Sequence, residues 1–186
     1  MDLFRLFLWD GKSRGASSGG PLFVPRDRQG AGRHDIPETD GVLYGSWVAI
    51  STVAEAIKSF RGRTIGGDFF RRPDGLVLAI APLELDDRAV IVDLNDPRNL
   101  VKRGLTPAKM ATVHRQTTQD IVRRLYDEGA AGFSWWSALE AEWQNVTLFE
   151  SRVKKHLKVK DAPIVLHARL PEVQEAAQRL VITLRD

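Results

Sequence analysis

Hydrophobic positions along this chain recur in two rhythms, one typical of helices and the other of strands. Residues 118–128 carry apolar side chains at Ile121, Val122 and Leu125, which fall on one face of a helix. Gly129 follows as a stop signal, because glycine readily adopts the backbone conformation that ends a helix. This segment is therefore predicted to be an amphipathic helix.

A second helix is predicted over residues 51–60. Ser51 is a favourable N-cap residue, and apolar side chains such as Val53 and Ile57 fall on one face. A last helix is expected to begin at Pro171, because proline is favoured at the first helical position. Both segments are long enough to cover part of a sheet.

Short apolar runs between these helices predict strands, because β-branched and aromatic residues dominate them. The runs at 76–85 and 89–94 are joined by Asp86-Asp87, which predicts a hairpin. Strands and helices do not alternate regularly, so the pattern favours an α+β fold with a mostly antiparallel or mixed sheet. The other expected strands are 42–44, 133–136, 145–149 and 164–170.

Composition narrows the class of protein without naming a function. The 186 residues fit one domain, and 43% hydrophobic with 27% charged residues is ordinary for a soluble globular protein. A net charge of +3 is too small to indicate nucleic-acid binding, and the lack of cysteine excludes disulfides, thiolate zinc sites and cysteine nucleophiles. No apolar run approaches the roughly 20 residues of a membrane helix. We expect a cytoplasmic protein that does not bind membranes.

The first twenty residues differ in composition from the rest. Residues 1–10 are apolar but interrupted by charges, which makes them a poor signal peptide. Residues 11–20 are rich in glycine and serine and are expected to form a flexible connector or loop. The chain is thus divided into an N-terminal arm and loop, 1–20, and a domain, 21–186.

A stretch rich in arginine and glycine, residues 23–35, is the strongest chemical signal. Arg26, Arg28 and Arg33 lie within eight positions, and the glycines between them allow backbone to approach a ligand. Arginine presents a planar fork that matches phosphate oxygens, which suits an anionic substrate such as a dinucleotide. The alternative is a solvated basic loop. The four histidines have no metal-ligand spacing, so no metal site is expected.

Three further residues have both a structural and a functional interpretation. Tyr44, at the end of a strand, is either a packing residue or a stacking surface for a flat ring. Glu55 lies on the polar face of its predicted helix, which faces either solvent or a cleft. Ser137 has no histidine near it in sequence and gives no sign of being an activated nucleophile. The basic cluster 153–160 is either a solvated helix end or a surface for an acidic partner.

The order of these motifs resembles the RES domain, a family named for an arginine, a glutamate and a serine. The resemblance rests on Gly32-Arg33, the strand 42–44 ending in tyrosine, Glu55, Ser137 and the strand 145–149. It spans residues 21–149. His34-Asp35 and Trp135-Trp136 depart from the residues common in the family, which indicates a divergent branch.

The resemblance implies a fold similar to ADP-ribosyltransferase toxins: a single domain with a split, twisted mixed sheet and helices around an NAD cleft. Many members are toxins neutralised by a helix-turn-helix antitoxin. Their activities are NAD hydrolysis or phosphorolysis and ADP-ribosylation of a protein. NAD would be the substrate, with no metal or other cofactor.

The resemblance also implies roles for individual residues. Arg33, with Arg26, would bind ribose and pyrophosphate oxygens, and Tyr44 would stack on nicotinamide. Glu55 would stabilise positive charge at the ribose, and Ser137 would bond to the substrate or orient Glu55. Three functions stay open: an NAD-degrading toxin, a protein ADP-ribosyltransferase, and a non-enzymatic binding module that uses the 153–160 cluster, which the modest net charge disfavours.

Overall fold

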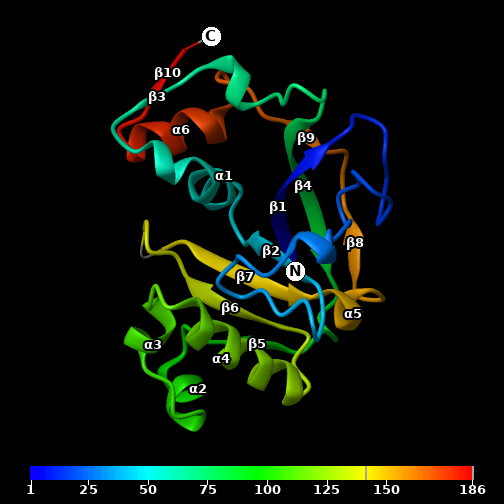
Figure 1. Cartoon of the computed structure of the whole chain (residues 1–186), viewed down its shortest axis with the longest axis vertical. Helices are drawn as coiled ribbons and strands as arrows, with labels where there is room; N and C mark the ends of the chain where they lie inside the picture. Colours follow the sequence, from blue (N-terminus) through cyan, green and yellow to red (C-terminus); the bar gives the residue numbers. More distant parts are fainter. Residues whose placement is uncertain (141, 186) are drawn as a thin grey trace. The chain divides into compact units, whose positions relative to one another are not determined.

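The computed structural model describes residues 1–140 and 142–185 (Figure 1). The chain forms two compact units. The first unit consists of Met1, Val24–Tyr44 and Leu85–Leu157. The second consists of Asp2–Phe23, Gly45–Glu84 and Lys158–Asp186. Each unit therefore collects segments that are far apart in the sequence.

The sheet of the first unit joins parallel and antiparallel pairs. Strand β5 (Ile91–Asp93) pairs in parallel with β6 (Gly132–Trp136), and β6 pairs antiparallel with β7 (Gln144–Phe149). Strand β2 (Val42–Ser46) begins in this unit and ends in the second. The side chains of β6 and β7 are mostly buried, as expected for strands with a covered face.

Helix α4 (Arg115–Asp127) supplies much of the core of the first unit, and the predicted helix at 118–128 is confirmed. Its apolar face belongs to a buried cluster that includes Phe133 and Phe149. The shorter helices are the 3-10 turn η1 (Arg26–Arg28), α2 (Pro97–Lys102), α3 (Pro107–Ala111) and α5 (Glu150–Val153). Asp96 and Thr106 cap α2 and α3 with their side chains, each before a proline at the first helical position.

In the second unit, β1 (Asp2–Trp9) pairs antiparallel with β4 (Val77–Leu85) along its whole length. β1 also pairs with the end of β2, and β4 pairs with β9 (Ile164–Val165). Outside this sheet, β3 (Thr64–Ile65) and β10 (Thr183–Leu184) form a small parallel pair. The remaining strand is β8 (Leu157–Val159).

Two helices pack together in the second unit. Helix α1 (Ala49–Ile57) contacts both β1 and α6 (Pro171–Arg179), which begins at Pro171 as predicted. The 3-10 turns are η2 (Lys58–Phe60), directly after α1, and η3 (Gly67–Phe69). Within the described residues, no helix is both long and apolar enough to cross a membrane.

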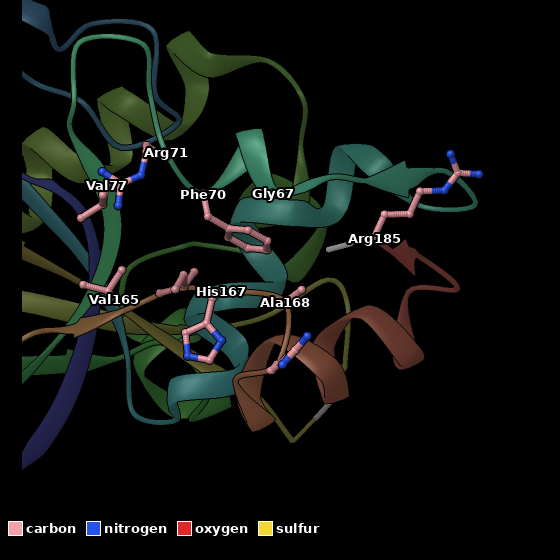
Figure 2. Close-up of a pocket in the computed structure, with 10 residues that line it drawn as sticks. Gly67, Phe70, Arg71, Val77, Val165, His167, Ala168 and Arg185 are labelled. Carbon is pink, nitrogen blue, oxygen red and sulfur yellow. The ribbon is translucent and has the colours of Figure 1, made fainter.

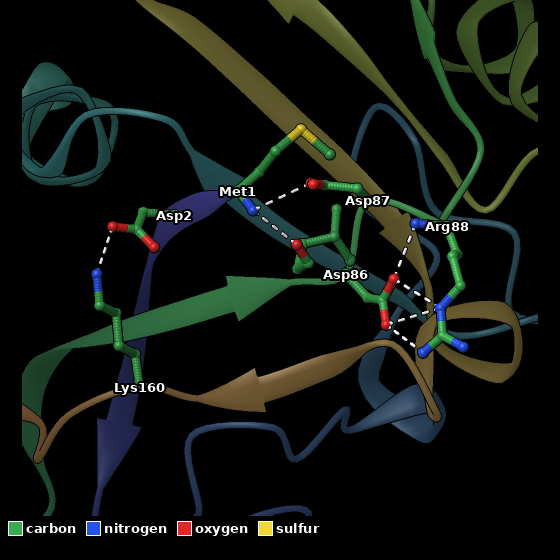
Figure 3. Close-up of polar contacts among 7 residues, drawn as sticks. Met1, Asp2, Asp86, Asp87, Arg88 and Lys160 are labelled. Atoms are coloured by element: carbon green, nitrogen blue, oxygen red, sulfur yellow. Dashed lines mark hydrogen bonds and ion pairs between the residues drawn. The ribbon is translucent and has the colours of Figure 1, made fainter.

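The α+β class and the mixed sheet are confirmed, but the predicted hairpin of 76–85 with 89–94 is wrong. β4 pairs with β1, whereas β5 pairs with β6. The Asp86 carboxylate accepts the N–H of Arg88 and contacts its guanidinium (Figure 3). This turn redirects the chain between two strands with different partners, and the apolar pattern of a strand does not encode which partner it takes.

Three other local predictions need correction. Ser51 does not cap α1; the N-cap is Val48, and Ser51 is buried inside the helix. The strand expected over 164–170 is only two residues long. Lys158, in the basic cluster 153–160, lies in a strand, β8, instead of at a helix end.

The glycine-rich stretch 11–20 begins with a hydrogen-bonded turn. The Asp10 carboxylate accepts the Ser13 hydroxyl and the N–H groups of Lys12 and Ser13, and these bonds lower the pKa of Asp10 to about 2. Trp9 Nε1 donates to the Ser13 carbonyl at 3.1 Å. β1 thus leads into an organised loop, while the division of the chain after residue 20 stays a prediction.

Candidate functional site

The loop that carries the arginine motif is folded around the Asp35 carboxylate. Oδ2 of Asp35 accepts the N–H groups of Gly30 at 2.8 Å and Gly32 at 2.6 Å. A Cβ added to Gly32 would lie 2.6 Å from Oδ1, so a larger residue at this position would displace the carboxylate. Oδ1 accepts the hydroxyl of Tyr44 at 2.7 Å. The loop and the tyrosine on β2 are therefore held together by one buried carboxylate.

Tyr44 has a partly exposed ring and a hydroxyl that is fixed by hydrogen bonds. The hydroxyl also accepts the backbone N–H of His34 at 3.1 Å, and 37% of the residue's surface is exposed. Burial of the hydroxyl and its bond to the Asp35 carboxylate raise the pKa of Tyr44 above its usual value. The phenol stays protonated at neutral pH. A fixed, partly exposed ring is the arrangement that stacking on a flat ligand requires.

His34 is buried beneath this ring, with 1% of its surface exposed. The His34 and Tyr44 rings stack with centroids 5.9 Å apart and planes inclined by 21°. The rings of Phe133 and Trp135 approach His34 edge-on. Burial, with the Arg33 guanidinium as a second cause, lowers the pKa of His34 to about 3, so its imidazole is neutral at pH 7.

A hydrogen-bond chain fixes the orientation of His34. Trp135 Nε1 donates to Thr147 Oγ1 at 3.2 Å, and Thr147 Oγ1 lies 2.9 Å from His34 Nδ1. Thr147 Oγ1 therefore bridges the indole of Trp135 and the imidazole of His34. Among the described residues, Nε2 is buried without a hydrogen-bond partner.

The Arg33 side chain lies beside the ring of Trp135. One guanidinium nitrogen donates to the Met110 carbonyl, and the carbonyl of Arg33 accepts the Thr118 hydroxyl. The guanidinium carbon lies 6.0 Å from the centre of the Trp135 ring. Arg33 also lines a small pocket of about 40 Å³ with Met110, Ala111, Trp135, Trp136 and Ala138. The C-terminal end of α3 therefore meets the arginine loop at this pocket.

Ser137 lies directly after β6 and is buried. Its N–H donates to the Trp143 carbonyl at 2.8 Å, and its hydroxyl oxygen accepts the N–H of Leu139 at 3.1 Å. These bonds organise the turn that leaves β6, as serine hydroxyls often do. The position of Ser137, two residues beyond Trp135, places it in the same unit as Arg33 and Tyr44.

Arg26 and Glu55 complete the predicted set. Arg26 is exposed in η1, and its Nε donates to the Pro37 carbonyl at 2.6 Å. Glu55 belongs to the second unit, on α1, where its side chain is 24% exposed and pairs with Lys58 Nζ at 2.7 Å. The sequence analysis placed Glu55 on the polar side of this helix, and its partial exposure agrees with that.

The structure thus joins Arg33 and Tyr44 through two residues that sequence reasoning passed over, His34 and Asp35. They were noticed only as departures from a family motif. Trp135 was likewise noted only as a departure from the family, and Thr147 was not singled out, although both contact His34. The signal that was available is the motif itself, since polar residues inside a glycine-rich loop commonly hold its backbone.

Comparisons with known proteins bear on the family and the fold of the chain. The family model of the RES domain matches residues 6–171, a longer stretch than the expected 21–149. A chain in the crystal structure of the M. tuberculosis MbcT-MbcA toxin-antitoxin complex has a similar fold, with a TM-score of 0.68 and 15% sequence identity. The similarity covers 95% of this chain and 88% of that one. No curated protein matches. Because the family model matches most of its length, the chain belongs to the RES domain family.

Proposed function

We propose that this protein is an enzyme that consumes NAD by breaking the bond between nicotinamide and ribose. The observation that supports it best is the attachment of Tyr44, on β2, to the loop that carries Arg33, through hydrogen bonds to His34 and Asp35, with the Tyr44 ring partly exposed. This arrangement offers a guanidinium for phosphate or ribose oxygens and a flat surface for nicotinamide.

Cleavage of the nicotinamide–ribose bond needs little acid catalysis. Nicotinamide is already cationic in NAD, so it leaves with the electron pair of the broken bond and needs no proton. The ribose passes through an oxocarbenium-like state, as in glycoside hydrolysis. A carboxylate stabilises that positive charge, and we assign this role to Glu55 on the family resemblance. Arg33, with Arg26, would bind ribose and pyrophosphate oxygens.

The acceptor decides which reaction occurs. Water gives ADP-ribose and a proton, and phosphate gives ADP-ribose 1″-phosphate; in each case the acceptor oxygen forms the new bond at the ribose carbon. Transfer to a nucleophilic side chain of a protein is the alternative activity. All three use the same residues. A non-enzymatic binding module is a weaker alternative, since it would not explain the loop around Asp35 and Tyr44.

We further propose that the protein is the toxin of a toxin–antitoxin pair and acts in the cytoplasm. The fold similarity to a chain of the MbcT-MbcA toxin-antitoxin complex supports this proposal. Its partner would be an antitoxin that covers the active site. Expression of the chain in bacteria without an antitoxin should then deplete NAD and stop growth.

The decisive experiment mixes the purified chain with NAD in three conditions: buffer alone, buffer with phosphate, and buffer with lysate protein. Mass spectrometry of the products should show free nicotinamide with ADP-ribose, its phosphate ester, or ADP-ribosylated protein. A chelator should leave turnover unchanged, since no metal is invoked. Intact NAD in all three conditions would refute the proposal.

A further inference from the structure

The second unit contains a surface pocket that none of the candidate NAD-binding residues lines (Figure 2). It lies among the start of η3, the residues that follow η3, the start of β4, β9 and the residues that follow β9. Its volume is about 390 Å³. Pockets for small molecules typically enclose roughly 300–1,000 Å³, so this one has room for a ligand of modest size.

The charged side chains that line this pocket are all basic. Arg71, Arg169 and Arg185 line it together with His167, and none of the ten lining residues is acidic. All four of these side chains are exposed. Guanidinium groups around one concave surface create a positive potential that attracts anions.

Two of these arginines differ from many others on the surface of this chain. Arg72, Arg88 and Arg179 each pair with a carboxylate a few positions away. Within the part of the chain that the structure describes, Arg71 and Arg185 form neither an ion pair nor a side-chain hydrogen bond. Their donors are therefore available to a ligand without breaking an internal contact.

The inner wall of the pocket is apolar. Phe70, Val77 and Leu166 line it and are buried, and Val165 adds an exposed apolar side chain. In Figure 2, Arg71 and Arg185 are drawn at opposite ends, with Phe70 and His167 between them. A ligand that fits this arrangement has an anionic group at one end and a flat or apolar body that lies over the middle.

We propose that this pocket binds a nucleoside monophosphate. The phosphate accepts from Arg71 or Arg185, because the guanidinium fork matches two phosphate oxygens. The base lies against His167 and the apolar wall, where an exposed imidazole offers a face for stacking. This site lies outside the residues assigned to NAD and adds a second ligand to the protein, independent of the proposed reaction.

Calorimetric titration of the full chain at low salt tests the proposal with three probes: AMP, adenosine and inorganic phosphate. AMP should bind at least about tenfold more tightly than either fragment, since it uses both the charge and the apolar wall. The double variant Arg71→Gln/Arg185→Gln should weaken AMP binding at least about tenfold. The two single variants show which end holds the phosphate.

Control variants separate this pocket from the NAD site. Arg61→Gln removes an exposed arginine of the same unit that does not line the pocket, and should leave AMP binding unchanged. Arg33→Lys should also leave it unchanged, while the double variant should keep NAD turnover. Thermal unfolding confirms that each variant is folded.

Four results would overturn the proposal: no binding of AMP, AMP binding that survives the double variant, AMP binding lost in Arg33→Lys instead, or inorganic phosphate that binds as tightly as AMP. An inactive enzyme with a functional AMP site would refute only the NAD proposal. Failure of AMP to bind an active enzyme would refute only this one.

Discussion

His34 Nδ1 lies 2.9 Å from Thr147 Oγ1, although the two residues are 113 positions apart in the sequence. This contact links the arginine loop to β7. It orients an imidazole on which the Tyr44 ring stacks and against which Trp135 packs. His34, which stands where tryptophan is common in the family, therefore contacts several residues of the candidate site.

The stability of the protein should depend on pH through His34. Its pKa falls from 6.5 to about 3 on folding, so below pH 6.5 the unfolded chain takes up a proton that the folded chain does not. The free energy of unfolding should therefore decrease, by up to about 1.4 kcal/mol per pH unit, as the pH falls from 6.5 towards 3.

Urea unfolding at several pH values measures this slope in the wild type and in His34→Gln, which has no titrating group at this position. The variant should lose the part of the slope that His34 causes, whereas His114→Gln, at an exposed position, should keep it. Equal slopes in the wild type and His34→Gln would show that His34 is not buried as a neutral group.

Glu55→Gln tests the carboxylate assigned to the ribose. The substitution keeps the shape of the side chain and removes its charge, so NAD turnover should fall by a factor on the order of 10²–10³. Glu175→Gln removes an exposed carboxylate from α6 of the same unit and should leave turnover near the wild-type value. Near-normal turnover in Glu55→Gln would show that Glu55 is a solvated helix residue without a role in catalysis.

Arg33→Lys keeps the positive charge and loses the planar fork. If Arg33 binds NAD oxygens at two points, the KM for NAD should rise at least about tenfold. Arg28→Lys, an exposed position in the same segment, is the matched control. Unchanged NAD affinity in Arg33→Lys would leave its contacts with the Met110 carbonyl and the Trp135 ring as the explanation for this arginine.

Two substitutions of Tyr44 separate stacking from hydrogen bonding. Tyr44→Phe keeps the ring and loses the bond to Asp35, which should cost about 1–3 kcal/mol of stability because a buried carboxylate loses a donor. Tyr44→Ala also removes the ring. If stacking on nicotinamide is the role, kcat/KM should fall much further in Tyr44→Ala than in Tyr44→Phe. Similar kcat/KM losses in both would assign the role to the hydroxyl.

The elements with strong local signals were predictable from the sequence. The helix at 118–128, the strands at 133–136 and 145–149, and the helix that begins at Pro171 all follow from periodicity and capping. The pairing of β4 with β1 was not predictable, because the apolar pattern of each strand does not show which other strand it pairs with.

The site was predictable only as a set of motif positions. Arg33 and Tyr44 were identified, but the residues that join them were not, because His34 and Asp35 act through contacts with Thr147 and with backbone N–H groups. Such contacts depend on how the loop folds in three dimensions. A single sequence shows the residues of a buried polar cluster but not their pairing.

Ser137 has two possible roles, and Ser137→Ala distinguishes them. Its hydroxyl oxygen accepts the N–H of Leu139, which fits a residue that organises the end of β6. If it only orients the substrate or Glu55, its loss should cost roughly 0.5–1.5 kcal/mol of transition-state stabilisation, or up to about 3 with a charged partner. A covalent nucleophile would lose nearly all activity and leave a trappable adduct.

We expect the smaller loss, since a nucleophilic serine needs a base to take its proton. Among the described residues His34 is the one buried histidine, and its low pKa makes its imidazole a weak proton acceptor. Rapid quenching during turnover, followed by peptide mass spectrometry, decides between the roles. Ser151→Ala, which removes a hydroxyl bonded to Asp40 on the same unit, controls for a loss of stability alone. ADP-ribose attached to Ser137 would replace the direct mechanism with one that proceeds through a ribosyl-serine intermediate.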